Sequence, residues 1–300
     1  MSTAIEWTDE TWNPTTGCTK ISPGCAHCYI ERTPPFRKAG RRFGDKGHIP
    51  IVFHDDDRLA TPTTWKRPRR VFVNSLSDLF HTDIPDAFID RVFAVMAQTE
   101  RHTYQVLTKR AERMLAYYEG MAALDDKARA RRVLQAMYED HPARRLVLTN
   151  VHDAHLGGFP WPLPNVWQGV SVENQVAANR IDPLLLTRAA VRFLSVEPLL
   201  EPIALTPWLA IHPRPDWVIV GGESGPGARP CHVDWIRSVV QQCQRAGVSA
   251  FVKQLGSHVL HDYPTRGVAT RYTLHDKKGG DLSEFPYDLR VREFPRGATA

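Results

Sequence analysis

The sequence lacks any apolar run of about 18 residues, the shortest stretch from which a helix crosses a membrane. Its first residues, MSTAIEWTDETW, contain no basic stretch followed by an apolar one, so they do not form a secretory signal. It also lacks an internal repeat of fixed period. Apolar residues make up 42% and charged residues 24% of the 300 positions, as in ordinary globular proteins. We therefore expect a cytoplasmic protein with no membrane partner.

Cysteine is scarce and unevenly placed. The chain has five cysteines, and three of them lie within eleven residues. An odd number with this clustering is a poor disulfide framework and favours a group of metal ligands. The formal net charge of +5 is too small to establish a nucleic-acid partner by itself.

Short apolar runs recur along the chain and alternate with helical patterns. Residues 86–99 follow Pro85 and place apolar residues on one face, while residues 234–246 have Asp234 as the predicted N-cap and Gly247 as the C-cap. This alternation predicts an α/β fold, a partial or closed TIM-like barrel of about six parallel strands, with an open doubly wound sheet as the alternative. The predicted strands are residues 71–75, 104–108, 166–170, 191–195, 217–221 and 250–253.

Polar residues follow each of these strands. In a barrel the carboxyl ends of the strands meet on one face, where active sites lie, although loops are polar in any protein. The residues concerned are Ser75 and Asp78, Thr108 to Arg110, Ser171 and Glu173, Ser195 and Glu197, Glu223 and Ser224, and Lys253 and Gln254. We expect the barrel to span residues 1–256, with an insertion near 124–155, where the apolar run 146–148 is either part of the insertion or an extra strand. Residues 257–300 are then a polar extension or lid with little regular structure.

The segment GCTKISPGCAHCY contains Cys18, Cys25 and Cys28. A CxxC pair directs two sulfurs toward one centre, and the third cysteine can reach back across a Pro-Gly turn. Thiolates at this density bind zinc or an iron–sulfur cluster. A structural zinc site needs a fourth protein ligand, which would be His27, His48 or His54. Three cysteines instead suit a [4Fe-4S] cluster with one iron left without a protein ligand, as a catalytic cluster requires.

This loop resembles the cluster loop of radical S-adenosylmethionine (SAM) enzymes, with spacers of six and two residues in place of three and two. His27 matches the aromatic residue that precedes the last cysteine. The Gly-Gly-Glu that follows the second strand of those enzymes is replaced here by Ser75-Leu76-Ser77-Asp78, and Gly221-Gly222-Glu223 follows a late strand.

Over most of its length the chain is similar to a phage- and prophage-associated family of three-cysteine-motif proteins, a domain of unknown function named after phage gene products thirty-seven and sixty-eight. The similar stretches are TWNPTTGC, CAHCY, VFVNSLSDLFH, YQVLTKR, NVWQGVSVEN, RFLSVEPLLEPI, WVIVGGESGPGARP and FVKQLG. The resemblance implies a radical SAM-like fold and cluster, with an unassigned substrate.

The resemblance also implies site roles. SAM would chelate the open iron, and an electron donor such as flavodoxin or ferredoxin would reduce the cluster. Candidates for binding SAM are Ser75, Asp78, Ser171, Glu173, Ser195 and Glu197, and candidates for catalysis are Lys109, Glu173, Glu197 and Glu223.

Two other functions remain open. One is a zinc-stabilised nucleic-acid-binding protein without catalysis, and the other is a nucleic-acid repair or modification enzyme related to photoproduct lyase. Basic groups would contact phosphates in either case, although solvated loops explain each group equally well. These groups are Arg37-Lys38 with Arg41-Arg42, Lys66-Arg67 with Arg69-Arg70, and Arg144-Arg145.

Overall fold

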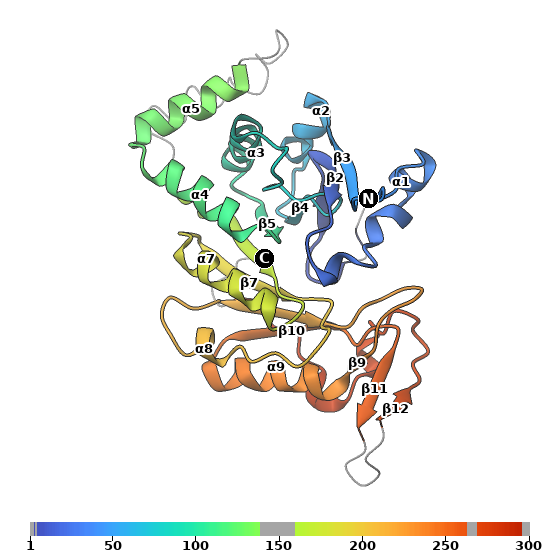
Figure 1. The fold of residues 1–300 in the computed structure, drawn as a ribbon. Helices are drawn as coiled ribbons and strands as arrows, with labels where there is room; N and C mark the ends of the chain where they lie inside the picture. Colours follow the sequence, from blue (N-terminus) through green and yellow to red (C-terminus); the bar gives the residue numbers. More distant parts are fainter. Residues whose placement is uncertain (1–2, 4, 139–159, 263–268, 296–300) are drawn as a thin grey trace.

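A computed structural model describes residue 3 and residues 5–138, 160–262 and 269–295. Its main feature is a sheet of seven parallel strands in the order β1-β4-β5-β6-β7-β8-β10, curled into a half-barrel (Figure 1). The strands are β1 (Glu10–Trp12), β4 (Arg70–Val73), β5 (Thr103–Thr108), β6 (Val166–Ser171), β7 (Val191–Val196), β8 (Trp217–Gly221) and β10 (Ser249–Gln254). The prediction of an α/β partial TIM-like barrel is confirmed, and all six predicted strands are present.

The seventh strand, β1, was not predicted. It is three residues long and pairs with β4 at one edge of the sheet. The chain then forms a separate hairpin of β2 (Thr15–Thr19) and β3 (His48–Phe53), in which Cys18 pairs with Ile49. The first cysteine is therefore held on a strand.

The helices include the two that the sequence predicts. The prediction for residues 86–99 is confirmed by α3, and Gly247 ends α9 in the left-handed conformation, as expected for a C-cap. The predicted N-cap is wrong, because α9 begins one residue before Asp234 and His232 takes the cap position. Asp234 instead pairs with Arg237 one turn later. The α-helices are α1 (Pro34–Lys38), α2 (Asp56–Leu59), α3 (Asp86–Gln98), α4 (Ala111–Ala122), α5 (Asp126–Tyr138), α7 (Ile181–Leu186), α8 (Thr206–Leu209) and α9 (Val233–Ala246); the 3-10 helices are η1 (Pro23–Cys25), η2 (Tyr29–Arg32), η3 (Thr61–Thr64), η5 (Val176–Arg180), η6 (Leu282–Glu284) and η7 (Tyr287–Leu289).

Side chains alternate between two cores along each strand. On the outer face, residues such as Val71 and Val218 pack against the helices. On the inner face, an aromatic cluster fills the amino-terminal half of the half-barrel, with the Trp7 and Phe72 rings 4.7 Å apart. Gly169 is required beside this cluster, because a Cβ there would lie 2.4 Å from the Phe193 ring. The aromatic packing leaves the carboxyl ends of the strands for polar residues.

The tail after Gly256 has more regular structure than predicted. β11 (Val259–Asp262) pairs with both β9 (Cys231–His232) and β12 (Ala269–Tyr272). Further on, Phe294 stacks on Trp217, whose indole N–H donates to the Glu293 carbonyl at 2.7 Å. The end of the described chain thus packs on the inner aromatic cluster.

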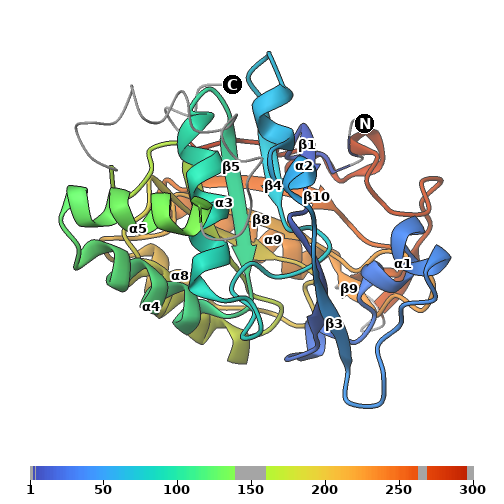
Figure 2. The same cartoon turned by 90° about the horizontal axis from the view of Figure 1, so that it is seen from above.

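The predicted insertion contains α5, which packs against α3 (Figure 2). The apolar run 146–148 and Arg144-Arg145 lie outside the described residues. No helix in the described ranges is long and apolar enough to cross a membrane.

Candidate functional site

The predicted polar residues lie at the carboxyl ends of the parallel strands, and the cysteine loop (residues 18–28) lies over those ends. Gly24 N donates to the Glu173 carboxylate after β6, and His27 contacts Glu223 after β8. The Tyr29 hydroxyl donates to the carbonyl of Ser75 after β4. The loop therefore spans the half-barrel from β4 to β8.

Local hydrogen bonds shape the loop. Cys25 N donates to Ser22 O at 2.9 Å and Cys28 N donates to Cys25 O at 3.3 Å, so the CxxC pair is held in successive tight turns. Lys20 Nζ closes the loop by donating to the Ala26 carbonyl at 3.0 Å. Cys18, Cys25 and Cys28 are all free thiols with partial exposure.

Burial disfavours the charged forms of two of these thiols. It raises the pKa of Cys18 to about 12, with Asp78 adding to the effect and Arg110 opposing it. Burial likewise raises the pKa of Cys28. Cys25 lies close enough to both thiols to raise their pKa values further. A bound metal would supply the positive charge that three neighbouring thiolates need.

The spacing of the sulfurs differs from that of a single-ion site. Within the part of the chain that the structure describes, the three Sγ atoms do not all lie within 4.8 Å of one another. Zn–S bonds of about 2.3 Å in tetrahedral geometry would bring the sulfurs to about 3.8 Å. A cluster binds each sulfur through a different iron and accepts a wider spacing.

The three histidines considered as a fourth ligand all have other partners. His27 Nδ1 lies 3.0 Å from Glu223 Oε2, and His48 Nδ1 lies 2.8 Å from the Thr19 hydroxyl. His54 lies 3.2 Å from the Arg58 guanidinium. None of them joins the cysteines in a group of three close ligand atoms among the described residues.

Glu173 holds the middle of the cysteine loop. Its Oε2 accepts a hydrogen bond from Arg180 Nη1 at 2.8 Å, and its Oε1 accepts one from Gly24 N at 3.4 Å. Although burial raises the pKa of Glu173, the nearby Lys109 and Arg180 lower it below its ordinary value. The approach requires glycine, because a Cβ on Gly24 would lie 2.9 Å from Glu173 Cδ.

Glu223 holds the second half of the loop through Arg229. Arg229 donates to both carboxylate oxygens, from Nε at 2.9 Å and from Nη2 at 2.6 Å, and its Nη1 donates to the Pro23 carbonyl at 2.8 Å. Burial alone would raise the pKa of Glu223, but the hydrogen bonds from Arg229 and His27 lower it to about 2. Glu223 is thus ionised and fully engaged.

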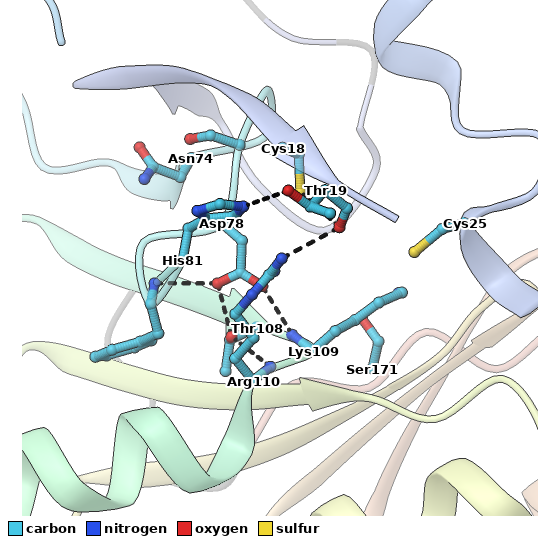
Figure 3. A network of polar contacts seen from close by, with 12 residues as sticks. Cys18, Thr19, Cys25, Asn74, Asp78, His81, Thr108, Lys109, Arg110 and Ser171 are labelled. Carbon is cyan, nitrogen blue, oxygen red and sulfur yellow. Dashed lines mark hydrogen bonds and ion pairs between the residues drawn. The ribbon is translucent and has the colours of Figure 1, made fainter. Parts of the chain in front are cut away.

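Asp78 connects three elements below Cys18 (Figure 3). Its Oδ1 accepts from the Thr108 hydroxyl at 2.7 Å, and its Oδ2 accepts from Arg110 Nη1 at 2.9 Å. Arg110 Nη2 then donates to the carbonyl of Thr19, the residue after Cys18, at 3.1 Å. Asp78 therefore positions the strand that carries Cys18.

Among the other predicted residues, Glu197 is also occupied, because it accepts from Lys253 Nζ at 2.7 Å and from Gln254 Nε2 at 3.1 Å. Ser171 and Ser195 are buried and adjacent in register on β6 and β7. Lys109 differs from the charged candidates above. Its ammonium group has no hydrogen-bond or ion-pair partner in the described ranges, and it lies near Cys28 and Glu173, whose pKa values it lowers.

One group of potential metal ligands does lie close together. Ligand atoms of His48, His81 and Asp83 lie within 4.8 Å of one another. Hydrogen bonds account for this group, because the Thr19 hydroxyl lies 2.8 Å from both His48 Nδ1 and His81 Nε2. His81 Nδ1 also accepts from Asp83 N at 3.1 Å.

Sequence reasoning did not identify the groups that hold the glutamates and the hairpin. Arg180 follows Glu173 by seven residues on η5, and no motif marks it. Thr19 is adjacent to Cys18, but nothing in the sequence predicts that two histidines contact it. Arg229 lies within the Gly-rich segment after β8 and could have been identified as the partner of Glu223 from that position.

No curated protein and no solved structure matches the chain. A family model matches residues 2–286, nearly the whole chain and all residues of the strand-end site. The chain therefore belongs to the family described as protein of unknown function (DUF5131).

Proposed function

We propose that this protein is a radical SAM-like iron–sulfur enzyme, in which Cys18, Cys25 and Cys28 hold a [4Fe-4S] cluster with one iron open to SAM. The observation that carries the proposal is the cysteine loop itself. Three free thiols gather over the carboxyl ends of a parallel half-barrel, and the nearby histidines are engaged elsewhere. Three cysteines without a fourth protein ligand among the described residues suit a cluster with one open iron better than a structural zinc site, which needs four ligands.

When bound, a reduced cluster would supply the electron that cleaves a carbon–sulfur bond of SAM. The protein's own groups would bind, orient and shield the reactants. Lys109 is the candidate to pair with the SAM carboxylate, because its charge lies near Cys28 without a direct partner among the described residues. Ser171 and Ser195 offer hydroxyl groups on the same face.

The carboxylates take a positioning role in this proposal. Glu173 and Glu223 hold the loop with Cys25 and Cys28, and Asp78 holds the strand with Cys18 through Arg110. These three carboxylates follow three different strands. Together they would fix the positions of the three sulfurs, so that the iron without a protein ligand would face the carboxyl ends of the strands. Glu197, which accepts from Lys253 and Gln254, is the candidate for proton transfer.

Metal analysis of anaerobically purified protein tests this proposal. We expect iron and sulfide in equal amounts, about four of each per chain, and a broad absorption near 400 nm, roughly as in other iron–sulfur proteins. Changing Cys18, Cys25 or Cys28 singly to alanine should abolish the absorption, while Cys243→Ala, a substitution in the core, should keep it. A colourless protein with stoichiometric zinc would support the zinc-stabilised alternative instead.

A further inference from the structure

The positive charge of the chain is concentrated beside the cysteine loop. Residues 20–46, here called the basic segment, contain seven lysine and arginine residues and two acidic residues. Their formal charge of +5 equals that of the whole chain, so the remaining 31 basic and 31 acidic residues balance. The basic segment includes Cys25 and Cys28, so the excess charge adjoins the proposed metal ligands in the sequence.

Four of these cations are free to meet a ligand. Arg37 and Lys38 end α1, Arg42 and Lys46 lie in the loop that follows, and all four are exposed. In the part of the chain that the structure describes, none of the four side chains has a hydrogen-bond or ion-pair partner. By contrast, the arginines of the strand-end site each pair with a carboxylate. Exposed and unneutralised cations in one segment attract a polyanion.

The helix that carries two of these cations, α1, is anchored by buried apolar side chains. Phe36 of α1 is fully buried and packs with Ile30 and Ile49 in a small cluster, against which Cys18 and Cys28 also lie. Figures 1 and 2 show α1 at the periphery of the molecule, outside the half-barrel. A ligand on α1 would therefore contact the same unit that carries the cysteines.

The composition of this surface favours a nucleic acid over a protein. The basic segment exposes only two large apolar side chains, Ile21 and Tyr29, and none between residues 30 and 46, where the four free cations lie. Protein interfaces instead place apolar or aromatic anchors at their centre. Cations alone suffice to bind a phosphate backbone. We propose that the basic segment binds the phosphate backbone of a nucleic acid.

Tyr29 places the bound strand relative to the metal centre. It follows Cys28 directly, the residue is 48% exposed, and its hydroxyl donates to the Ser75 carbonyl. An exposed aromatic ring held in this way suits the stacking of an unpaired base, which favours single-stranded over duplex substrate. The binding of a nucleic acid to the basic segment follows from the charges of that segment. That the bound strand is also the substrate of the enzyme depends on the proposed function.

Fluorescence anisotropy with a labelled single-stranded DNA of about 20 nucleotides tests the proposal. The test variant changes Arg37, Lys38, Arg42 and Lys46 to glutamine. The control variant makes the same change at Arg188, Arg245, Lys277 and Lys278, which are equally exposed and have the same two-arginine, two-lysine composition. Four phosphate contacts predict a slope of about −2.8 in log K against log salt, a loss of roughly 50-fold between about 50 and 200 mM salt. The control should keep this dependence, and the test variant should lose most of it.

Three outcomes would overturn the proposal. The wild-type chain does not bind DNA at low salt, both variants lose affinity equally, or the chain binds an acidic flavodoxin through the basic segment but not DNA. Circular dichroism of both variants checks that each is folded. The anisotropy is measured on protein with and without iron, so that a failed metal analysis and a failed binding experiment are told apart.

Discussion

Glu223→Gln should destabilise the protein at neutral pH, because Glu223 and Arg229 join β8 to the cysteine loop. The pKa of Glu223 is lowered from its ordinary value of 4.5 to about 2. This difference corresponds to about 3 kcal/mol in favour of the ionised folded state, at about 1.4 kcal/mol per pH unit. Since the Arg229 side chain is 27% exposed, solvent screening reduces this figure, and we expect a loss of about 2 kcal/mol.

The dependence on pH has a definite sign. A carboxyl group with a lowered pKa contributes its full stability above its ordinary pKa and loses it as the pH falls from about 4.5 toward about 2. At about pH 3 the unfolded group is protonated while the folded group is still ionised, so more than half of the contribution is already lost. The difference between wild type and variant should therefore shrink to below about 1 kcal/mol at that pH.

Urea unfolding followed by tryptophan fluorescence measures both quantities on the metal-free protein. Glu119→Gln serves as the control, because Glu119 is exposed on α4, and it should change the free energy of unfolding by less than about 0.5 kcal/mol. A Glu223→Gln difference that stays constant between about pH 7 and pH 3 would show that the charge of Glu223 does not hold the loop.

Three further substitutions test the other contacts of the site. Asp78→Asn should cost about 3 kcal/mol in urea unfolding, because it leaves the buried Arg110 guanidinium without its counter-ion; an equal cost for the exposed Asp57→Asn would contradict this. Gly24→Ala should cost about 1–2 kcal/mol, since the added Cβ meets Glu173, and should reduce iron retention after gel filtration; full iron retention would argue against this contact. Lys109→Met should weaken SAM binding, measured by equilibrium dialysis, by about tenfold or more with unchanged iron content; unchanged affinity would remove Lys109 from the SAM site.

The strands and their order of appearance were predictable because buried parallel strands form short apolar runs that the chain repeats between helices. The six predicted strands all pair in the central sheet. β1 was missed because Glu10–Trp12 is too short to form such a run, and its place is fixed only by pairing with β4. The N-cap of α9 was misjudged because the Asp234 carboxylate has a better partner in Arg237.

The strand-end site was predictable in its location but not in its contacts. Parallel strands necessarily bring Asp78, Glu173, Glu197 and Glu223 to one face. Whether a carboxylate is free or paired depends on residues that the fold brings near it. All four are paired: Asp78 with Arg110, Glu173 with Arg180, Glu197 with Lys253 and Glu223 with Arg229. Only the pair with Arg229 could have been predicted, because Arg229 follows Glu223 closely in the Gly-rich segment. The same holds for the charge of the basic segment, whose significance depends on its cations having no acidic partner among the residues that the structure describes.

The most direct test of the central claim is electron paramagnetic resonance of the anaerobically reduced protein with and without SAM. Three cysteine ligands and one open iron predict the signal of a reduced [4Fe-4S] cluster whose shape changes when SAM is added, in wild type but not after loss of the cluster in Cys28→Ala. A cluster signal that SAM leaves unchanged, or a reduced protein with no such signal, would contradict the account.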